Sequence, residues 1–93
     1  MEIRANGDRL WHSLMEMAKI GPGEHGGNRR LALSDEDIEG RTLFQKWAAE
    51  AGCTIRRDPM GNIFARRDGK SPDKDPVLSG SHLDTQPAGG RFD

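Results

Sequence analysis

The sequence predicts an α/β chain in which two helices precede about three strands. Two stretches carry apolar residues at helical spacing, and the pattern changes to short extended pieces after Cys53. No further helical pattern follows the last predicted strand, so the order of elements matches half of an α/β sandwich. We therefore expect the 93 residues to be incomplete as a folding unit.

An apolar stripe at spacings of three and four predicts the first helix over residues 8–19, with Asn6 as its N-terminal cap. The stripe consists of Leu10, Trp11, Leu14, Met17 and Ala18. Residues 21–28 follow with four glycines and Pro22, a composition that excludes a helix or a central strand. We expect a glycine-rich loop there.

The second helix is predicted to start at Ser34, because the acidic residues 35–37 after it form a capping-box-like arrangement. Their negative charges suit the positive end of a helix dipole. Helical spacing of apolar residues continues to Ala51, and Gly52 stands where a left-handed C-terminal cap is expected.

Short extended segments predict the strands. Residues 53–57 and 62–67 are separated by a turn at residues 58–61, a pattern typical of a β-hairpin. After a polar loop, residues 76–81 are predicted as a third strand that ends at His82.

Composition limits the classes of partner and the size of the core. The 14 Lys and Arg residues nearly balance the 15 Asp and Glu residues, for a formal net charge of −1, which disfavours nucleic acid and membrane surfaces as partners. Leu, Ile, Val and Phe make up 16 of 93 residues, about 17%, below the roughly 20% of an ordinary globular chain. We expect a thin core.

Cysteine usage and hydropathy indicate the compartment. Cys53 is alone, so no internal disulfide can compensate for the thin core. The N-terminal residues lack the apolar run of a signal peptide, and no stretch of 18 apolar residues occurs. These features predict a cytoplasmic protein without a membrane span.

The candidate chemistry lies in the last residues. If the third strand stays extended through Asp84, the side chains of His82 and Asp84 project from the same face. Asp84 would then accept the second N–H of a metal-bound His82 imidazole. The turn at residues 87–90 returns Asp93, whose carboxylate can bridge two divalent ions. A His-x-Asp pair is also common by chance, and a lone histidine is more often a surface or core residue than a ligand.

Two longer strings carry a resemblance, Gly-Ser-His-Leu-Asp-Thr at residues 80–85 and Gly-Gly-Arg-Phe-Asp at residues 89–93. Together they resemble the first metal-ligand motif of the dinuclear zinc amidohydrolases related to aminoacylases and carboxypeptidases. The branch they resemble most contains N-carbamoyl-L-amino-acid hydrolases, β-ureidopropionases and allantoate amidohydrolases. That branch is also matched, in the same order, by residues 9–11, 20–21, 26–37, 40–41, 51–53 and 58–63. The resemblance therefore covers nearly the whole chain.

The resemblance implies roles for three residues. His82 resembles the ligand of one zinc ion, Asp93 the carboxylate that bridges both ions, and Asp84 the acid that orients His82. The implied cofactor is two Zn²⁺ per active site, with Mn²⁺, Co²⁺ or Ni²⁺ as alternatives. The implied reaction is hydrolysis of a non-peptide C–N bond in a small N-carbamoyl or ureido substrate, by water that the two zinc ions activate.

The resemblance also implies an organisation. Residues 1–93 correspond to the N-terminal segment of a zinc-hydrolase catalytic domain, and the lid or dimerisation domain is absent from them. The full-length protein is expected to be a homodimer. With at most two direct protein ligands, His82 and Asp93, the 93 residues alone are expected to be inactive and to bind zinc weakly.

Two other functions stay open on the sequence: a related zinc aminoacylase or peptidase, and a non-catalytic binding module. Arg29 and Arg30 suit a substrate carboxylate, solvent, or a salt bridge to residues 35–37. His12 and His25 are read as surface or packing residues. Cys53 has no histidine base indicated near it and is read as a small apolar residue.

Overall fold

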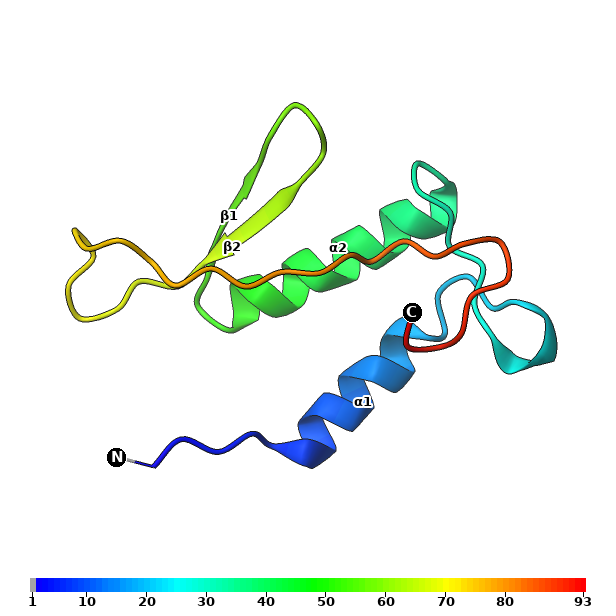
Figure 1. Cartoon of the computed structure of the whole chain (residues 1–93), viewed down its shortest axis with the longest axis horizontal. Coiled ribbons are helices and arrows are strands. Elements are labelled where there is room, and N and C mark those ends of the chain that lie inside the picture. The colour runs from blue at the N-terminus through cyan, green and yellow to red at the C-terminus, as the bar shows by residue number, and fades with distance from the viewer. Residues whose placement is uncertain (1) are drawn as a thin grey trace. The chain divides into compact units, whose positions relative to one another are not determined.

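The computed structural model describes residues 2–93 and contains two α-helices, one short 3₁₀ helix and two strands (Figure 1). In chain order these are α1 (Gly7–Met17), η1 (Glu24–Gly26), α2 (Asp35–Glu50), β1 (Thr54–Arg57) and β2 (Ile63–Arg66). The chain divides into two compact units. The first contains the residues up to Gly40 together with Leu83–Asp93, and the second contains Arg41–His82.

Helix α1 starts at the predicted cap. The side-chain oxygen of Asn6 accepts a hydrogen bond from the Arg9 backbone N–H at 3.0 Å, which satisfies one N–H that the first turn leaves without a helical partner. The predicted apolar stripe does not become a buried face, because Leu10 and Trp11 are 55% and 58% exposed. Position and cap are therefore confirmed, while no residue of α1 is buried.

Helix α2 has the predicted signals at both ends. Ser34 Oγ accepts from the Asp37 backbone N–H at 3.2 Å, and the Asp37 carboxylate accepts from the Leu33 N–H at 3.1 Å. At the other end Gly52 has a φ of +86°, and the Cys53 N–H donates to the Ala48 carbonyl at 2.9 Å. This is the Schellman arrangement, which glycine adopts without a steric penalty.

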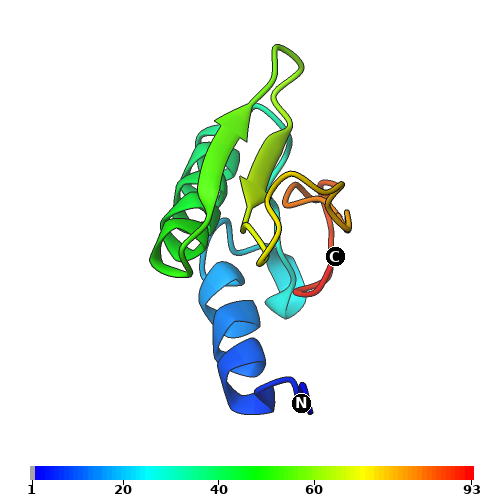
Figure 2. The same ribbon diagram turned by 90° about the vertical axis from the view of Figure 1, so that its left-hand side faces the viewer.

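The predicted hairpin is confirmed. Strands β1 and β2 pair antiparallel from Thr54 opposite Arg66 to Arg57 opposite Ile63 (Figure 2). In the turn, the Asp58 carboxylate accepts from both the backbone and the side-chain N–H of Asn62, each at 2.8 Å. Because these contacts are local, the hairpin forms from residues close in sequence.

The predicted third strand at residues 76–81 is wrong. These residues have no strand assignment, and Val77 and Leu78 are 100% and 82% exposed. A strand requires a neighbouring backbone to which its N–H and C=O groups can pair, and the described sheet contains only β1 and β2. The α/β class with two helices followed by strands is thus confirmed, with two strands in place of three.

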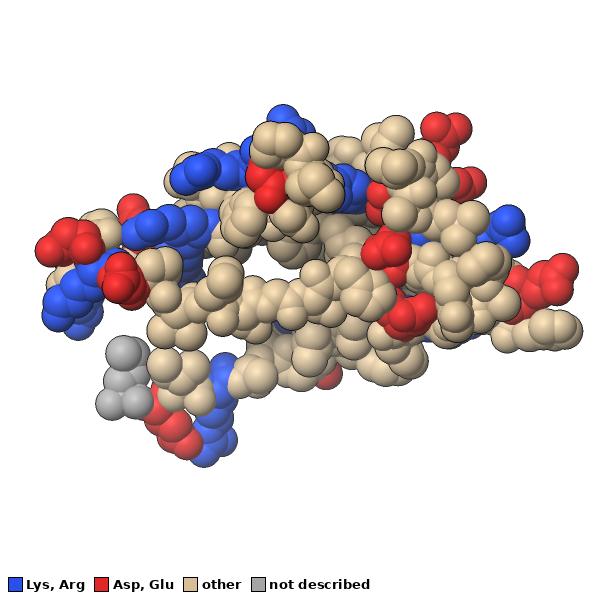
Figure 3. Space-filling view, turned by 45° about the horizontal axis from the view of Figure 1, so that its top comes forward, with Lys and Arg blue, Asp and Glu red and all other residues tan. Residues whose placement is uncertain are grey.

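The thin core is confirmed, and the buried positions are mainly polar. Among residues 2–93 the one buried hydrophobic side chain is Ala48, whereas Asn28, Arg30, Asp37 and Thr85 are buried. Both acidic and basic side chains occur on the face shown in Figure 3, in agreement with the balanced net charge. None of the helices in residues 2–93 is long and apolar enough to cross a membrane.

Candidate functional site

Within the first unit, the loop after α1 lies antiparallel to the segment that carries the predicted site residues. The Asn28 N–H donates to the Gly89 carbonyl at 2.8 Å, and the Gly89 N–H donates back to the Asn28 carbonyl at 3.0 Å. The Thr85 N–H donates to the Arg30 carbonyl at 2.7 Å, and the Arg30 N–H donates to Thr85 Oγ1 at 2.9 Å. We call these four residues, Asn28, Arg30, Thr85 and Gly89, the polar frame.

Arg30 is the largest buried side chain of the frame and is 2% exposed. Its Nε donates to the Leu83 carbonyl at 2.8 Å, and its Nη1 donates to the carbonyls of Ile20 at 2.7 Å and Met17 at 3.2 Å. The guanidinium therefore caps the negative C-terminal end of α1 and holds the backbone next to Asp84.

Burial lowers the pKa of the Arg30 guanidinium below its ordinary value. The negative charges of Asp37, Asp84 and Asp93 act in the opposite direction and raise it. A guanidinium stays charged under these conditions, so the frame contains one buried positive charge that three carboxylates stabilise.

Asn28 holds the turn that leaves α1. It is fully buried, and its Nδ2 lies 2.7 Å from the Ala18 carbonyl oxygen, 3.1 Å from that of Gly21 and 3.3 Å from that of Ile20. Its Oδ1 is buried and has no hydrogen-bond partner among the described residues. The amide group therefore acts as a donor to backbone carbonyls that the end of a helix leaves unsatisfied.

Glycine at position 89 allows Asp93 to come close. A Cβ atom at this position would lie 2.9 Å from Asp93 Oδ2 and 3.0 Å from the Thr85 Cβ. On the opposite side, a Cβ at Gly27 would overlap the Gly89 carbonyl oxygen. Gly27 thus allows the close approach of the two backbones, and Gly89 leaves room for the Asp93 carboxylate beside the frame.

The structure places two of the three predicted site residues in one unit. Asp84 is half-buried and Asp93 is exposed, and both act on the charge of Arg30. His82 is exposed and is the last residue of the second unit. Imidazole nitrogen and carboxylate oxygen are donors that zinc accepts, so the residue types fit the implied metal.

The number of ligands does not reach that of a complete site. A catalytic zinc has three protein ligands as a rule, and residues 2–93 contain no group of three or more His, Cys, Asp or Glu side chains placed to hold a metal. The metal roles of His82 and Asp93, and the orienting role of Asp84, stay predictions.

The structure separates the two neighbouring arginines. Arg29 is exposed, while Arg30 is buried and donates to backbone carbonyls, so of the two arginines Arg29 is the one that faces solvent. Asn28 and Thr85 were not predicted as site residues. Their one signal was their place in stretches that carry the family resemblance, because polar residues in a loop give no hydropathy pattern.

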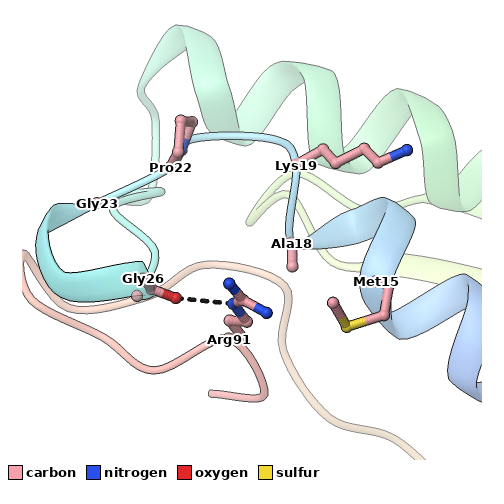
Figure 4. Close-up of a pocket in the computed structure, with 8 residues that line it drawn as sticks. Met15, Ala18, Lys19, Pro22, Gly23, Gly26 and Arg91 are labelled. Carbon is pink, nitrogen blue, oxygen red and sulfur yellow. Dashed lines mark hydrogen bonds between the residues drawn. The ribbon is translucent and has the colours of Figure 1, made fainter.

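A cavity of about 210 Å³ lies beside the polar frame, between the end of α1 and the glycine-rich loop. Arg91 closes one side, where its Nε donates to the Gly26 carbonyl at 2.8 Å (Figure 4). Lys19, also on the rim, is paired with Glu16 at 2.6 Å. The cavity is therefore lined by backbone, aliphatic groups and two cations.

Comparison with known proteins assigns the chain to a region of longer hydrolases. No family model matches it. It is 62% identical over 90 residues to an N-carbamoyl-L-amino-acid amidohydrolase of Rhizobium meliloti, covering 97% of this chain and 22% of that protein. It is 38% identical over 77 residues to an allantoate amidohydrolase of Escherichia coli, covering 83% of this chain and 19% of that protein.

A solved structure gives the same result for the fold. An amidase of the hydantoinase/carbamoylase family from Burkholderia multivorans superimposes with a TM-score of 0.94 and 59% identity, over 98% of this chain and 22% of that one. The chain thus spans about a fifth of the length of the relatives it matches. These findings confirm the resemblance drawn from the motifs.

Proposed function

We propose that this chain is part of an enzyme that hydrolyses N-carbamoyl substrates. The premise is that it has the sequence and fold of one segment of the N-carbamoyl-L-amino-acid amidohydrolases. The observation that carries the proposal is the 62% identity over 90 residues to such an amidohydrolase. This identity includes nearly the whole chain, so it is not limited to one short motif.

We assign His82 as a ligand of one zinc ion, Asp93 as the carboxylate between two zinc ions, and Asp84 as the residue that orients the His82 imidazole. The bound metal would polarise the scissile carbonyl and lower the pKa of the attacking water. The support is the donor chemistry of the three side chains and the place of Asp84 and Asp93 in the same unit. The general base and the remaining ligands would come from residues outside the 93.

We further propose that residues 1–93 are the N-terminal segment of the catalytic domain of a longer, cytoplasmic, homodimeric protein. The relatives are more than four times as long as the matched segment, since it spans 22% of the first of them. Ten large hydrophobic residues of the described chain are exposed, among them Leu10, Trp11 and Phe92. Other parts of such a protein would cover them.

The test is zinc content and hydrolysis of an N-carbamoyl-L-amino acid by the protein that contains this chain. We expect bound zinc and turnover, and we expect His82→Ala and Asp93→Asn to abolish turnover and to lower zinc content. Full activity in the Asp93→Asn variant would contradict the metal assignment. Stoichiometric tight zinc, or turnover, in the isolated 93 residues would contradict the proposal that they supply only part of the site.

A second candidate is hydrolysis of allantoate, which the similarity to an allantoate amidohydrolase favours. A panel with an N-carbamoyl-L-amino acid, allantoate, an N-acyl amino acid and a dipeptide separates the two candidates from each other and from an aminoacylase or peptidase. No turnover of any of the four, together with cooperative unfolding of the isolated chain, would instead favour a binding module.

A further inference from the structure

The two carboxylates assigned to the metal site are attached to one short segment, residues 83–93, which contains no helix and no strand. A segment of this kind has no regular backbone pairing of its own to fix its side chains. Its position comes from contacts with the loop after α1, which lies more than 50 residues earlier in the sequence. The question is which of these contacts determine where Asp84 and Asp93 point.

Arg30 contacts the residues on both sides of Asp84. Its Nε donates to the carbonyl of Leu83 at 2.8 Å, directly before Asp84. Its backbone exchanges two hydrogen bonds with Thr85, directly after Asp84, at 2.7 and 2.9 Å. The backbone of Asp84 is thus held at both neighbouring residues by a single buried residue.

The frame also reaches Asp93. Asn28 pairs with Gly89 through two backbone hydrogen bonds, and Gly89 lies against the Asp93 carboxylate. The positive charge of Arg30 adds an electrostatic link, since the charges of both Asp84 and Asp93 raise its pKa. Arg30 therefore holds the backbone on both sides of Asp84, whereas Asn28 holds the turn that returns Asp93.

We propose that Arg30 is a positioning residue that sets the Asp84 carboxylate, the group assigned to orient the metal ligand His82, by clamping the backbone of residues 83–85 against the end of α1. The inference rests on the metal roles given under the proposed function. It adds a residue that does not touch the metal and whose guanidinium faces backbone carbonyls. Loss of a group that orients a metal ligand weakens metal binding by about 10- to 100-fold.

The chemistry of the contact explains why arginine is required. The planar guanidinium reaches the Leu83 carbonyl with Nε and the Ile20 and Met17 carbonyls with Nη1, in two directions at once. A lysine ammonium keeps the charge but is a single point, so it cannot bind both groups in the same geometry. Arg30→Lys therefore separates positioning from charge.

The experiment compares Arg30→Lys with Arg29→Lys in the zinc-loaded protein that contains this chain. Arg29 is the adjacent residue and is exposed, so it controls for a change of arginine to lysine at this place in the sequence. Zinc affinity is measured by competition with a chelator, well below the melting temperature of each variant. We expect about 10- to 100-fold weaker zinc binding for Arg30→Lys and no change for Arg29→Lys.

A second pair of variants, at Thr85, tests the same inference if Arg30→Lys fails to fold. Thr85 Oγ1 accepts from the Arg30 N–H at 2.9 Å and donates to the Gln86 carbonyl at 2.8 Å. Thr85→Val keeps the shape and removes both bonds, whereas Thr85→Ser keeps the hydroxyl. We expect Thr85→Val to weaken zinc binding, and we expect Thr85→Ser to bind zinc as the unsubstituted protein does. The visible absorption spectrum of the cobalt-substituted protein is expected to change in Thr85→Val and not in Thr85→Ser.

The outcomes are distinct. Folded Arg30→Lys and Thr85→Val variants with lower melting temperatures but unchanged zinc affinity and cobalt spectra would overturn the inference and leave Arg30 with a structural role only. In that case the unsubstituted protein would still bind zinc, and the proposed function would stand. Absence of zinc binding in the unsubstituted protein would overturn the metal assignment, and this inference with it.

Discussion

The substitution Asn28→Asp tests the polar frame, because it replaces the side-chain NH₂ group by an oxygen atom. The substitution keeps the shape of the side chain and removes both amide hydrogens. These hydrogens face the carbonyl oxygens of Ala18, Gly21 and Ile20 at 2.7, 3.1 and 3.3 Å. In their place, an acceptor oxygen would face three acceptor oxygens in a fully buried position.

The cost follows from the contacts. Two hydrogens serve the three carbonyls, so two hydrogen bonds of about 1 kcal/mol each are lost, and buried carbonyls left without a donor cost at least about 1 kcal/mol more. We expect the frame to open about 3 kcal/mol more easily, which corresponds to roughly 100-fold. The penalty is larger for the ionised carboxylate than for the protonated form, because a buried charge without a partner is costlier than a neutral group.

Amide hydrogen exchange measures this local opening. The Thr85 and Gly89 N–H groups donate to the carbonyls of Arg30 and Asn28, so their protection factors report whether the two segments stay paired. In Asn28→Asp we expect both to fall by roughly 100-fold at neutral pH. Burial raises the pKa of the introduced carboxyl group, so the loss is smallest at acidic pH and grows as the pH rises toward that raised value.

The same substitution at Asn6 is the control. There the side-chain oxygen accepts a hydrogen bond from the Arg9 N–H at the start of α1, and a carboxylate serves equally well at the positive end of a helix. Asn6→Asp is expected to leave protection of the frame unchanged. Equal protection factors in Asn28→Asp and Asn6→Asp, or a loss independent of pH, would refute the account of Asn28 as a required donor.

Three further changes test single positions. Gly89→Ala places a Cβ 3.0 Å from the buried Thr85 Cβ, so we expect about 1–3 kcal/mol lower stability, measured by thermal unfolding. Gly52→Ala meets no neighbouring atom within 4 Å but keeps a φ of +86°, so we expect a loss of about 1 kcal/mol in the same assay. Hydrogen bonds from Asn62 hold the pKa of the Asp58 carboxyl below its ordinary value of 3.8. The ionised carboxylate therefore contributes fully to hairpin stability above pH 3.8, and this contribution is lost as the pH falls through the lower pKa of the folded state. The amide NMR signals of the hairpin measure this loss.

Controls for these three changes are available in the chain. A Cβ added at Gly69 would have no atom within 4 Å, and Gly69 has no positive φ, so Gly69→Ala is expected to leave the melting temperature unchanged. A melting temperature for Gly89→Ala equal to that of Gly69→Ala would contradict the close packing of Gly89 against Thr85. Acid sensitivity of the hairpin that persists in Asp58→Asn would show that another group is responsible.

The sequence predicted the identity of the candidate site residues but not their geometry, and their roles stay predictions. His82, Asp84 and Asp93 were proposed because their spacing resembles a family motif. The expectation that His82 and Asp84 project from one face assumed a strand through these residues, and the structure has no strand there. Strand geometry depends on a pairing partner, which the motif does not specify.

The sequence by itself determined the local elements of this protein. The caps at Asn6 and Gly52 and the turn held by Asp58 arise from hydrogen bonds between residues at most five positions apart, so the information lies in adjacent residues. Only the tertiary structure decided that Arg30 is buried, since its partner Leu83 lies 53 positions away. A buried polar contact over such a separation produces no periodic pattern in the sequence. It depends on which carbonyl groups lie near the side chain once the two distant segments have come together, and the hydropathy of either segment does not specify this.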